Sequence, residues 1–126
     1  MPKSNDQRSE IPPGTLDLLI LRAVTRGSLH GYAIARRIKE RSRGELLVEE
    51  GSLYPALHRL VRLRQLVAEW GTSENNRRAR FYRITSAGQK RLKADASAWR
   101  RVSAAVTAVL DGRAPALEMR GLSWTA

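Results

Sequence analysis

Apolar positions recur at helical spacing in three short segments and in one long segment that follows them. This spacing predicts four helices, at about 16–25, at about 31–42, within 49–60 and at about 86–111. Between the third and fourth helices, residues 66–71 and 80–85 alternate apolar and polar side chains, which is the pattern of strands. The polar stretch TSENNRRA joins them, so the sequence predicts a β-hairpin.

Short polar residues mark the expected starts of several of these helices. Thr15, Ser52 and Thr85 stand where a side-chain oxygen can cap the first turn. Asp17 then lies in the first turn of its helix, where a negative charge is favourable. Pro55 is expected in the first turn of the third helix, where no backbone donor is needed.

Two sets of apolar residues exceed what a single small core requires. In the last helix, spacings of four and three residues describe a heptad-like row, which is typical of helices that pair. Leu18 and Leu21 lie off the apolar stripe of the first helix, and a second subunit is one way to cover them. The expected dimer interface therefore contains Leu18, Leu21, Leu92, Ala96, Trp99, Ser103, Val106 and Leu110.

These elements together predict a winged helix-turn-helix, which is a mainly α fold with a small β-hairpin, followed by a long C-terminal dimerisation helix. The expected organisation is a flexible arm at 1–14, the winged domain at 15–85, the dimerisation helix at 86–111 and a mobile tail at 112–126.

The charge of the chain points to a polyanionic partner. Its 126 residues include 23 Lys and Arg against 12 Asp and Glu, which gives a net charge of +11. Nucleic acid and an anionic membrane surface are the candidates for such a partner. The first 15 residues hold no apolar core of a signal peptide and the apolar runs are far too short to span a bilayer, so a cytoplasmic location is expected.

Catalytic and metal-binding patterns are weak in this sequence. There are no cysteines, and His30 and His58 have neither a thiol partner nor the spacing of a helical zinc site. His30 is expected to cap or pack at the start of the second helix. No glycine-rich phosphate loop and no paired carboxylates stand out. We therefore expect a protein without enzymatic activity, cofactor or metal.

The third predicted helix carries an unusual polar face. Tyr54, His58 and Arg62 follow one another at intervals of four residues, with Arg59 beside them, and Ser52 lies near the helix N-terminus. Hydroxyl, imidazole and guanidinium groups can bond base edges and phosphates, and a helix N-terminus suits a phosphate. We interpret this face as a DNA-binding surface rather than as ordinary surface or core.

The hairpin loop is the second candidate contact. Arg77, Arg78 and Arg80 lie at or next to its tip, where they can reach the DNA backbone or the minor groove. A solvated turn is the alternative reading of such a charge run. An RNA-binding protein and a protein-interaction module with an acidic partner remain alternatives for the chain as a whole.

Trp99 allows two readings. Midway along the heptad-like row it suits a core position, whereas its small neighbours Ala96 and Ser103 leave room for a planar effector to stack on the ring.

The segments GTLDLLILRAV, LHGYAIARRI, EEGSLYPALHRL, AEW and RFYRITSAG together resemble the PadR family of transcriptional regulators, in its short form with one C-terminal helix. The resemblance implies a homodimer, usually a repressor, that binds a palindromic operator through the third helix and the wing. It also implies that Tyr32 and Tyr54 touch DNA, and that Trp99 matches a tryptophan with which some relatives bind flat hydrophobic compounds between subunits.

The chain departs from the family pattern just after the third helix. Family members tend to have glycine there, whereas this chain has Arg64, and a non-glycine residue in a left-handed helix terminus costs about 1 kcal/mol or more. Either the turn at Arg64 therefore takes another geometry or the helix ends differently. Gln65 also replaces a residue that is commonly apolar.

Overall fold

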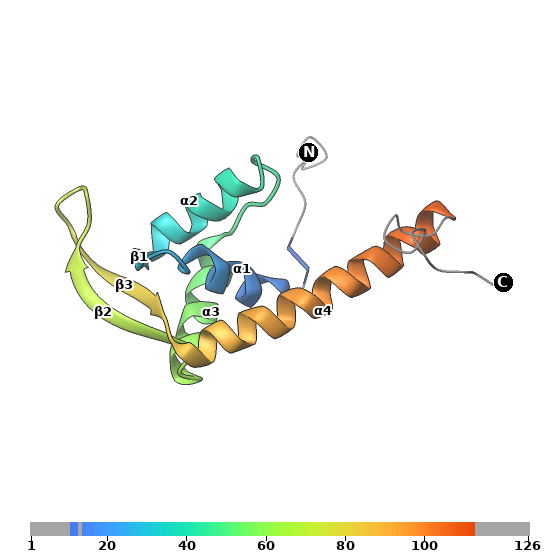
Figure 1. Cartoon of the computed structure of the whole chain (residues 1–126). Helices are drawn as coiled ribbons and strands as arrows, with labels where there is room; N and C mark the ends of the chain where they lie inside the picture. Colours follow the sequence, from blue (N-terminus) through green and yellow to red (C-terminus); the bar gives the residue numbers. More distant parts are fainter. Residues whose placement is uncertain (1–10, 13, 113–126) are drawn as a thin grey trace. The chain divides into compact units, whose positions relative to one another are not determined.

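The structure, a computed structural model, describes residues 11, 12 and 14–112 of the chain. Its contacts form one unit that extends to Leu92, which we call the head, and a second unit that begins at Lys93. The elements run in the order α1 (Thr15–Ala23), β1 (Leu29–His30), α2 (Gly31–Arg41), α3 (Glu50–Arg62), β2 (Leu66–Thr72), β3 (Arg78–Ile84) and α4 (Ser86–Asp111) (Figure 1). The mainly α architecture and the hairpin that the sequence predicts are thus confirmed.

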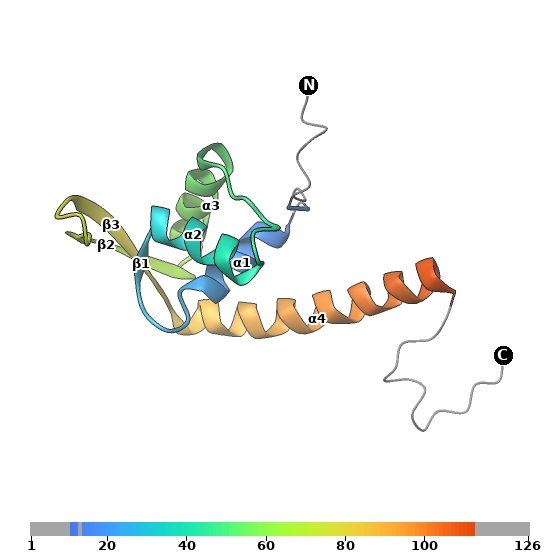
Figure 2. The same cartoon turned by 90° about the horizontal axis from the view of Figure 1, so that it is seen from above.

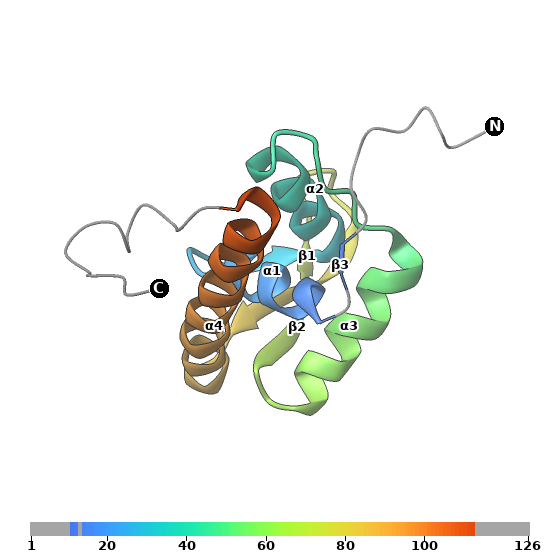
Figure 3. The same cartoon turned by 90° about the vertical axis from the view of Figure 1, so that its right-hand side faces the viewer.

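The core of the head forms where the apolar sides of α1, α2 and α3 meet the base of the sheet. Figure 3 shows α1 between α2 and α3, and α1 makes contacts with both. The large side chains with almost no exposed surface are Ile20, Leu21, Val24, Ile34, Leu53, Leu57, Leu60 and Leu66. Burial of each such side chain contributes about 1.5–3 kcal/mol. Leu16 and Leu19 pack partly buried against this cluster.

One strand of the sheet has no counterpart in the sequence prediction. The sheet is antiparallel with the order β1-β3-β2, and β1 adds only Leu29 and His30, opposite Tyr82 and Phe81. The hairpin of β2 and β3 extends beyond the helices of the head (Figure 2). We call β2, the loop 73–77 and β3 the wing.

Two of the predicted helix caps are wrong. The N-cap of α1 is Gly14, with φ of 84° and no side-chain hydrogen bond, and Thr15 is the first helical residue. The N-cap of α3 is Glu49, so Ser52 lies inside the first turn. Pro55 consequently stands one turn deeper in α3 than expected. Proline has no backbone N–H, so the Gly51 carbonyl receives no helical hydrogen bond from Pro55. Because Gly51 is exposed, water can reach this carbonyl instead.

The third predicted cap is confirmed and ties α4 to the preceding turn. The Thr85 hydroxyl accepts a hydrogen bond from the Gly88 amide at 3.0 Å and donates one to the Arg64 carbonyl at 2.8 Å. Arg64 itself takes the left-handed conformation, with φ of 63°, so the expectation that the turn or the helix end would differ there is wrong. Since the Gln65 amide reaches back to the Leu60 carbonyl at 2.9 Å, α3 ends in a Schellman turn with arginine in the usual glycine position.

The predicted arm lies mostly outside the described residues, and so does the predicted tail beyond Gly112. Among the described residues, no helix is long and apolar enough to cross a membrane.

Candidate nucleic-acid interface

A hollow of about 590 Å³ lies between the N-terminus of α2, the outer side of α3 and the wing, and we call it the groove. Each of the three elements contributes polar side chains because its apolar side is turned into the core. Residues predicted to contact DNA that line the groove are Tyr32, Tyr54, His58, Arg77, Arg78 and Arg80. The structure therefore brings together side chains that stand almost fifty positions apart in the sequence.

The groove depends on a close approach between α2 and α3. A β-carbon on Gly31 would lie 2.9 Å from the Tyr54 hydroxyl oxygen and 3.0 Å from Cε1 of its ring. Glycine at this position therefore allows the Tyr54 ring to lie against the start of α2. Tyr82 lines the floor and is only 3% exposed, and its burial raises the pKa of its hydroxyl.

Trp70 organises the basic side of the wing, a role that was not predicted from the sequence. It faces Arg80 across the hairpin, and the guanidinium carbon of Arg78 lies 4.5 Å from the centre of its ring. The Arg80 guanidinium carbon lies 5.5 Å from the same centre. Because the indole is 59% exposed, its face is available to both cations. The strand alternation that places Trp70 and Arg80 on one face was the signal that could have identified it.

His30 links the start of α2 to the wing. Its Nδ1 accepts a hydrogen bond from the Ala33 amide at 3.3 Å, which confirms the expected capping role. The proton therefore resides on Nε2, which lies 3.3 Å from the Glu74 carboxylate and donates to it. A second Glu74 oxygen lies 3.5 Å from Arg36, whose guanidinium carbon is 5.5 Å from the Tyr32 ring centre.

The acidity of Glu74 follows from these contacts. A hydrogen bond from its own backbone amide is the main cause that lowers the pKa of Glu74 below 4.5, and the His30 hydrogen bond adds to it. Because the folded pKa is depressed, the contacts of the carboxylate are fully present above its ordinary value and weaken as the pH falls through the lowered one. Glu74 thus fastens the loop of the wing to α2 at neutral pH.

Ser52 and Arg59 do not join the groove. Both line a different hollow together with Ile11, Pro12 and Glu49. Arg59 was expected to face DNA, but its guanidinium donates hydrogen bonds to both carboxylate oxygens of Asp17. Its charge is therefore already paired within the head, and contact of Arg59 with DNA stays a prediction. Arg62 is exposed at the end of α3 but does not line the groove.

Asp17 joins three helices of the head. Its side chain is 9% exposed and accepts from Arg59 on α3, and its Oδ2 lies 3.3 Å from the guanidinium of Arg91 on α4. Arg91 also donates to Gln65 Oε1 at 2.8 Å. Only a local role of Asp17 in its own helix was predicted, because nothing in the sequence relates it to positions 59 and 91.

The predicted dimer residues fall into two groups. Leu21 is 0% exposed in the core of the head, so it has no surface to offer a second subunit and its assignment to the interface was wrong. Leu92 likewise packs against the core of the head, and Leu18 is partly buried. On α4, by contrast, Trp99 is 48% exposed and Val106 is 50% exposed.

An apolar stripe runs along the later part of α4. Its residues, which we call the α4 stripe, are Val102, Ala105, Val106, Val109 and Leu110. Val109 and Leu110 are 81% and 77% exposed, which is unusual for large aliphatic side chains grouped on one helix face.

Comparison with known proteins places this geometry in a family. Residues 20–94 match the transcriptional regulator PadR-like family. A protein of uncharacterized function from Lysinibacillus sphaericus is 30% identical over 105 residues, which cover 83% of this chain and 96% of that protein.

Solved structures show the same arrangement of elements. A transcriptional regulator from Clostridium thermocellum is 28% identical, with a TM-score of 0.67 over 75% of this chain and 91% of that one. PadR from Bacillus subtilis, solved in complex with operator DNA, has a TM-score of 0.58 and 23% identity. The match to it covers 66% of this chain and 47% of that one, and shows a common winged-helix fold.

Proposed function

Because the chain belongs to the transcriptional regulator PadR-like family, we propose that it binds double-stranded DNA and acts as a homodimeric repressor at a palindromic operator. α3 enters the major groove and the wing reaches the backbone or the minor groove. The observation that carries the proposal is the groove, where Tyr32, Tyr54 and His58 lie with Arg77, Arg78 and Arg80 around one concave surface. A regulator of this kind works beside the chromosome, which agrees with the expected cytoplasmic location.

The chemistry of the groove suits a nucleic acid. Guanidinium groups bind phosphate oxygens with two hydrogen bonds at once, and tyrosine hydroxyls donate to phosphates and to base edges. The net charge of +11 favours association with a polyanion at low salt. The operator DNA bound by the structural neighbour from Bacillus subtilis supports the same class of partner for this fold.

Replacing Arg77 and Arg78 together by alanine is expected to weaken binding to duplex DNA. Each lost phosphate contact lowers the steepness of log affinity against log salt concentration by about 0.9, so we expect a slope shallower by about one to two units. The measurement is a fluorescence anisotropy titration of a labelled duplex at several salt concentrations.

A matched control removes the same charge elsewhere. Lys90 and Arg26 are both exposed, lie outside the wing and do not line the groove. The double variant Lys90→Ala with Arg26→Ala should leave the slope within about half a unit of the parent. An equal change in both variants would mean that only net charge matters. A structured RNA that displaces the duplex at fixed salt would favour the RNA-binding alternative.

The dimer part of the proposal rests on the α4 stripe. A contiguous row of valine and leucine side chains left in water is costly, and a second α4 packed against it removes that cost. Two winged domains held in this way present their recognition helices about one DNA turn apart, roughly 34 Å. A two-fold symmetric operator matches that arrangement.

Val106→Glu is expected to convert the dimer to monomer in sedimentation measurements at micromolar concentration, because each subunit then places a charge in the apolar contact. It should also weaken operator binding by about tenfold or more, since the two half-sites are no longer bound together. Ala104→Glu on the exposed opposite side of α4 is the control and should remain dimeric. A dimeric Val106→Glu variant would place the interface elsewhere.

We also propose that a small effector binds at Trp99 and relieves repression. Trp99 offers a half-exposed ring between Ala96 and Ser103, on which a planar hydrophobic compound can stack. Such a compound relieves repression only if it binds one arrangement of the dimer better than another. Equal operator affinities with and without the compound would exclude this mechanism.

A further inference from the structure

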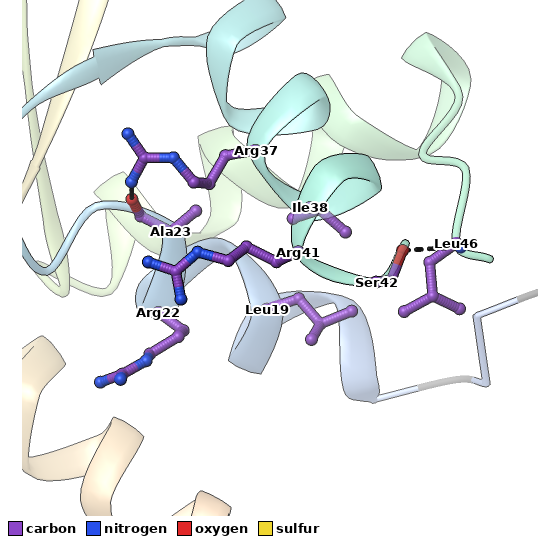
Figure 4. Close-up of a pocket in the computed structure, with 8 residues that line it drawn as sticks. All are labelled: Leu19, Arg22, Ala23, Arg37, Ile38, Arg41, Ser42 and Leu46. Atoms are coloured by element: carbon purple, nitrogen blue, oxygen red, sulfur yellow. Dashed lines mark hydrogen bonds between the residues drawn. The ribbon is translucent and has the colours of Figure 1, made fainter. Parts of the chain in front are cut away.

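A pocket of about 170 Å³ opens between α1 and α2 (Figure 4), and none of the residues that line it lines the groove. Its apolar wall comes from both helices and from the segment that follows α2. The side chains that form this wall are Leu19, Ala23, Ile38 and Leu46. Cavities of about 150 Å³ with aliphatic walls take up a benzene ring, so a hydrocarbon group of about six carbons fits here.

The rest of the lining is basic. Arg22, Arg37 and Arg41 line the pocket, and no carboxylate does. In Figure 4 their guanidinium groups lie on one side, while the leucine and isoleucine side chains lie on the other. The pocket is therefore amphipathic, with a positive side and a hydrocarbon side.

The positive side has spare hydrogen-bonding capacity. The Arg37 guanidinium donates to the Ala23 carbonyl at 3.4 Å, whereas the guanidinium groups of Arg22 and Arg41, which are exposed residues, have no hydrogen-bond or ion-pair partner among the described residues. The Ser42 hydroxyl is already engaged, since it donates to the Lys39 carbonyl and accepts from the Leu46 amide at 2.9 Å. Like charges on one rim repel each other, and an anion placed among them removes that repulsion.

We propose that this pocket binds a small amphipathic anion, namely a carboxylate that carries an alkyl group of about six carbons. The hydrocarbon lies against Leu19, Ile38 and Leu46, and the carboxylate accepts hydrogen bonds from Arg22 and Arg41. Guanidinium suits this role because its planar donors match the two carboxylate oxygens. The site shares no residue with Trp99 or with the groove, so it is independent of the proposed function.

Hexanoate is the probe that tests this site, with hexanol and hexylamine as matched neutral and cationic molecules. Titration of the full chain, without DNA, is followed by NMR of the methyl groups. We expect saturable shifts at the methyls of Leu19, Ile38 and Leu46, with hexanol at least about tenfold weaker because it lacks the charge-assisted hydrogen bonds. Hexylamine should cause no saturable shift at these methyls.

Arg22→Gln and Arg41→Gln should each weaken hexanoate binding by about tenfold, since one charged donor is lost. Both positions are exposed, so the variants should keep the methyl spectrum of the folded head. Arg26→Gln, an exposed arginine outside the pocket, removes the same charge and should bind like the parent. Equal binding of hexanol, an equal loss in Arg26→Gln, or no saturable shift at the three methyls would each overturn the proposal.

Discussion

Asp17→Ala is expected to lower the free energy of unfolding by about 2–3 kcal/mol. The carboxylate is 9% exposed and is shared by Arg59 and Arg91, so its removal leaves two partly buried cations without their common partner. Breaking a buried pair from one side costs about 3–5 kcal/mol. We expect a smaller loss because the Arg59 side chain is 45% exposed and retains contact with water.

Urea unfolding followed by circular dichroism measures this loss, and the chain offers a matched surface pair as control. Glu69 lies 3.5 Å from Arg83, and both side chains are more than half exposed. Glu69→Ala should therefore change the free energy of unfolding by less than about 0.5 kcal/mol. If the two variants lost the same stability, the Asp17 contacts would be ordinary surface pairs.

Gly88→Ala is the second substitution with a large expected effect, a loss of about 2–3 kcal/mol. Gly88 is buried at the start of α4, and a β-carbon there would collide with the Gln65 carbonyl oxygen and lie 2.8 Å from Ile84. The carbonyl cannot move aside easily because it accepts a hydrogen bond from the Thr85 amide at 3.1 Å. Overpacking of this kind costs about 1–3 kcal/mol, and rigid backbone places the site at the upper end.

Gly51→Ala serves as the control because it makes the same chemical change in another helix. Gly51 lies exposed in α3, and a β-carbon there meets nothing within 4 Å. Alanine should therefore stabilise the protein by about 0.5 kcal/mol through helix propensity. The two glycines should thus shift the midpoint of urea unfolding in opposite directions. A stabilised Gly88→Ala variant would show that α4 does not lie as close to Gln65 as described.

The helices and the hairpin could be predicted because each buries one side, which leaves a periodic pattern in the sequence. In α3, Leu53, Ala56, Leu57 and Leu60 are at most 2% exposed, and the residues between them face outward. The same regularity placed Tyr54 and His58 on one surface. Binary patterning of this kind reports local geometry without any knowledge of the partner elements.

Features that depend on distant partners could not be predicted. Leu29 and His30 become a strand only because the edge of β3 is available to them, and two residues carry no periodicity. Leu21 lies off the main stripe of α1, and the sequence does not distinguish cover by the head itself from cover by a second subunit. The head covers it, because α1 packs against both α2 and α3.

The candidate site shows the same division. The basic tip of the wing could be recognised from composition, whereas the choice of Asp17 as the partner of Arg59 depends on the packing of α1 against α3. At Arg64 we expected another turn or another helix end because a left-handed arginine is costly, yet the residue has a left-handed φ of 63°. The strained backbone of Arg64 persists because hydrogen bonds within the turn and from the Thr85 hydroxyl hold this segment in place.

The stacking of Arg78 and Arg80 on Trp70 has a consequence for the rate and entropy of association. A free arginine side chain gives up about 2 kcal/mol of rotamer entropy when it is immobilised. Here the indole already restricts both guanidinium groups, at 4.5 Å and 5.5 Å from its centre, before any partner arrives. An incoming polyanion therefore meets cations that are largely preorganised, and less ordering accompanies the encounter.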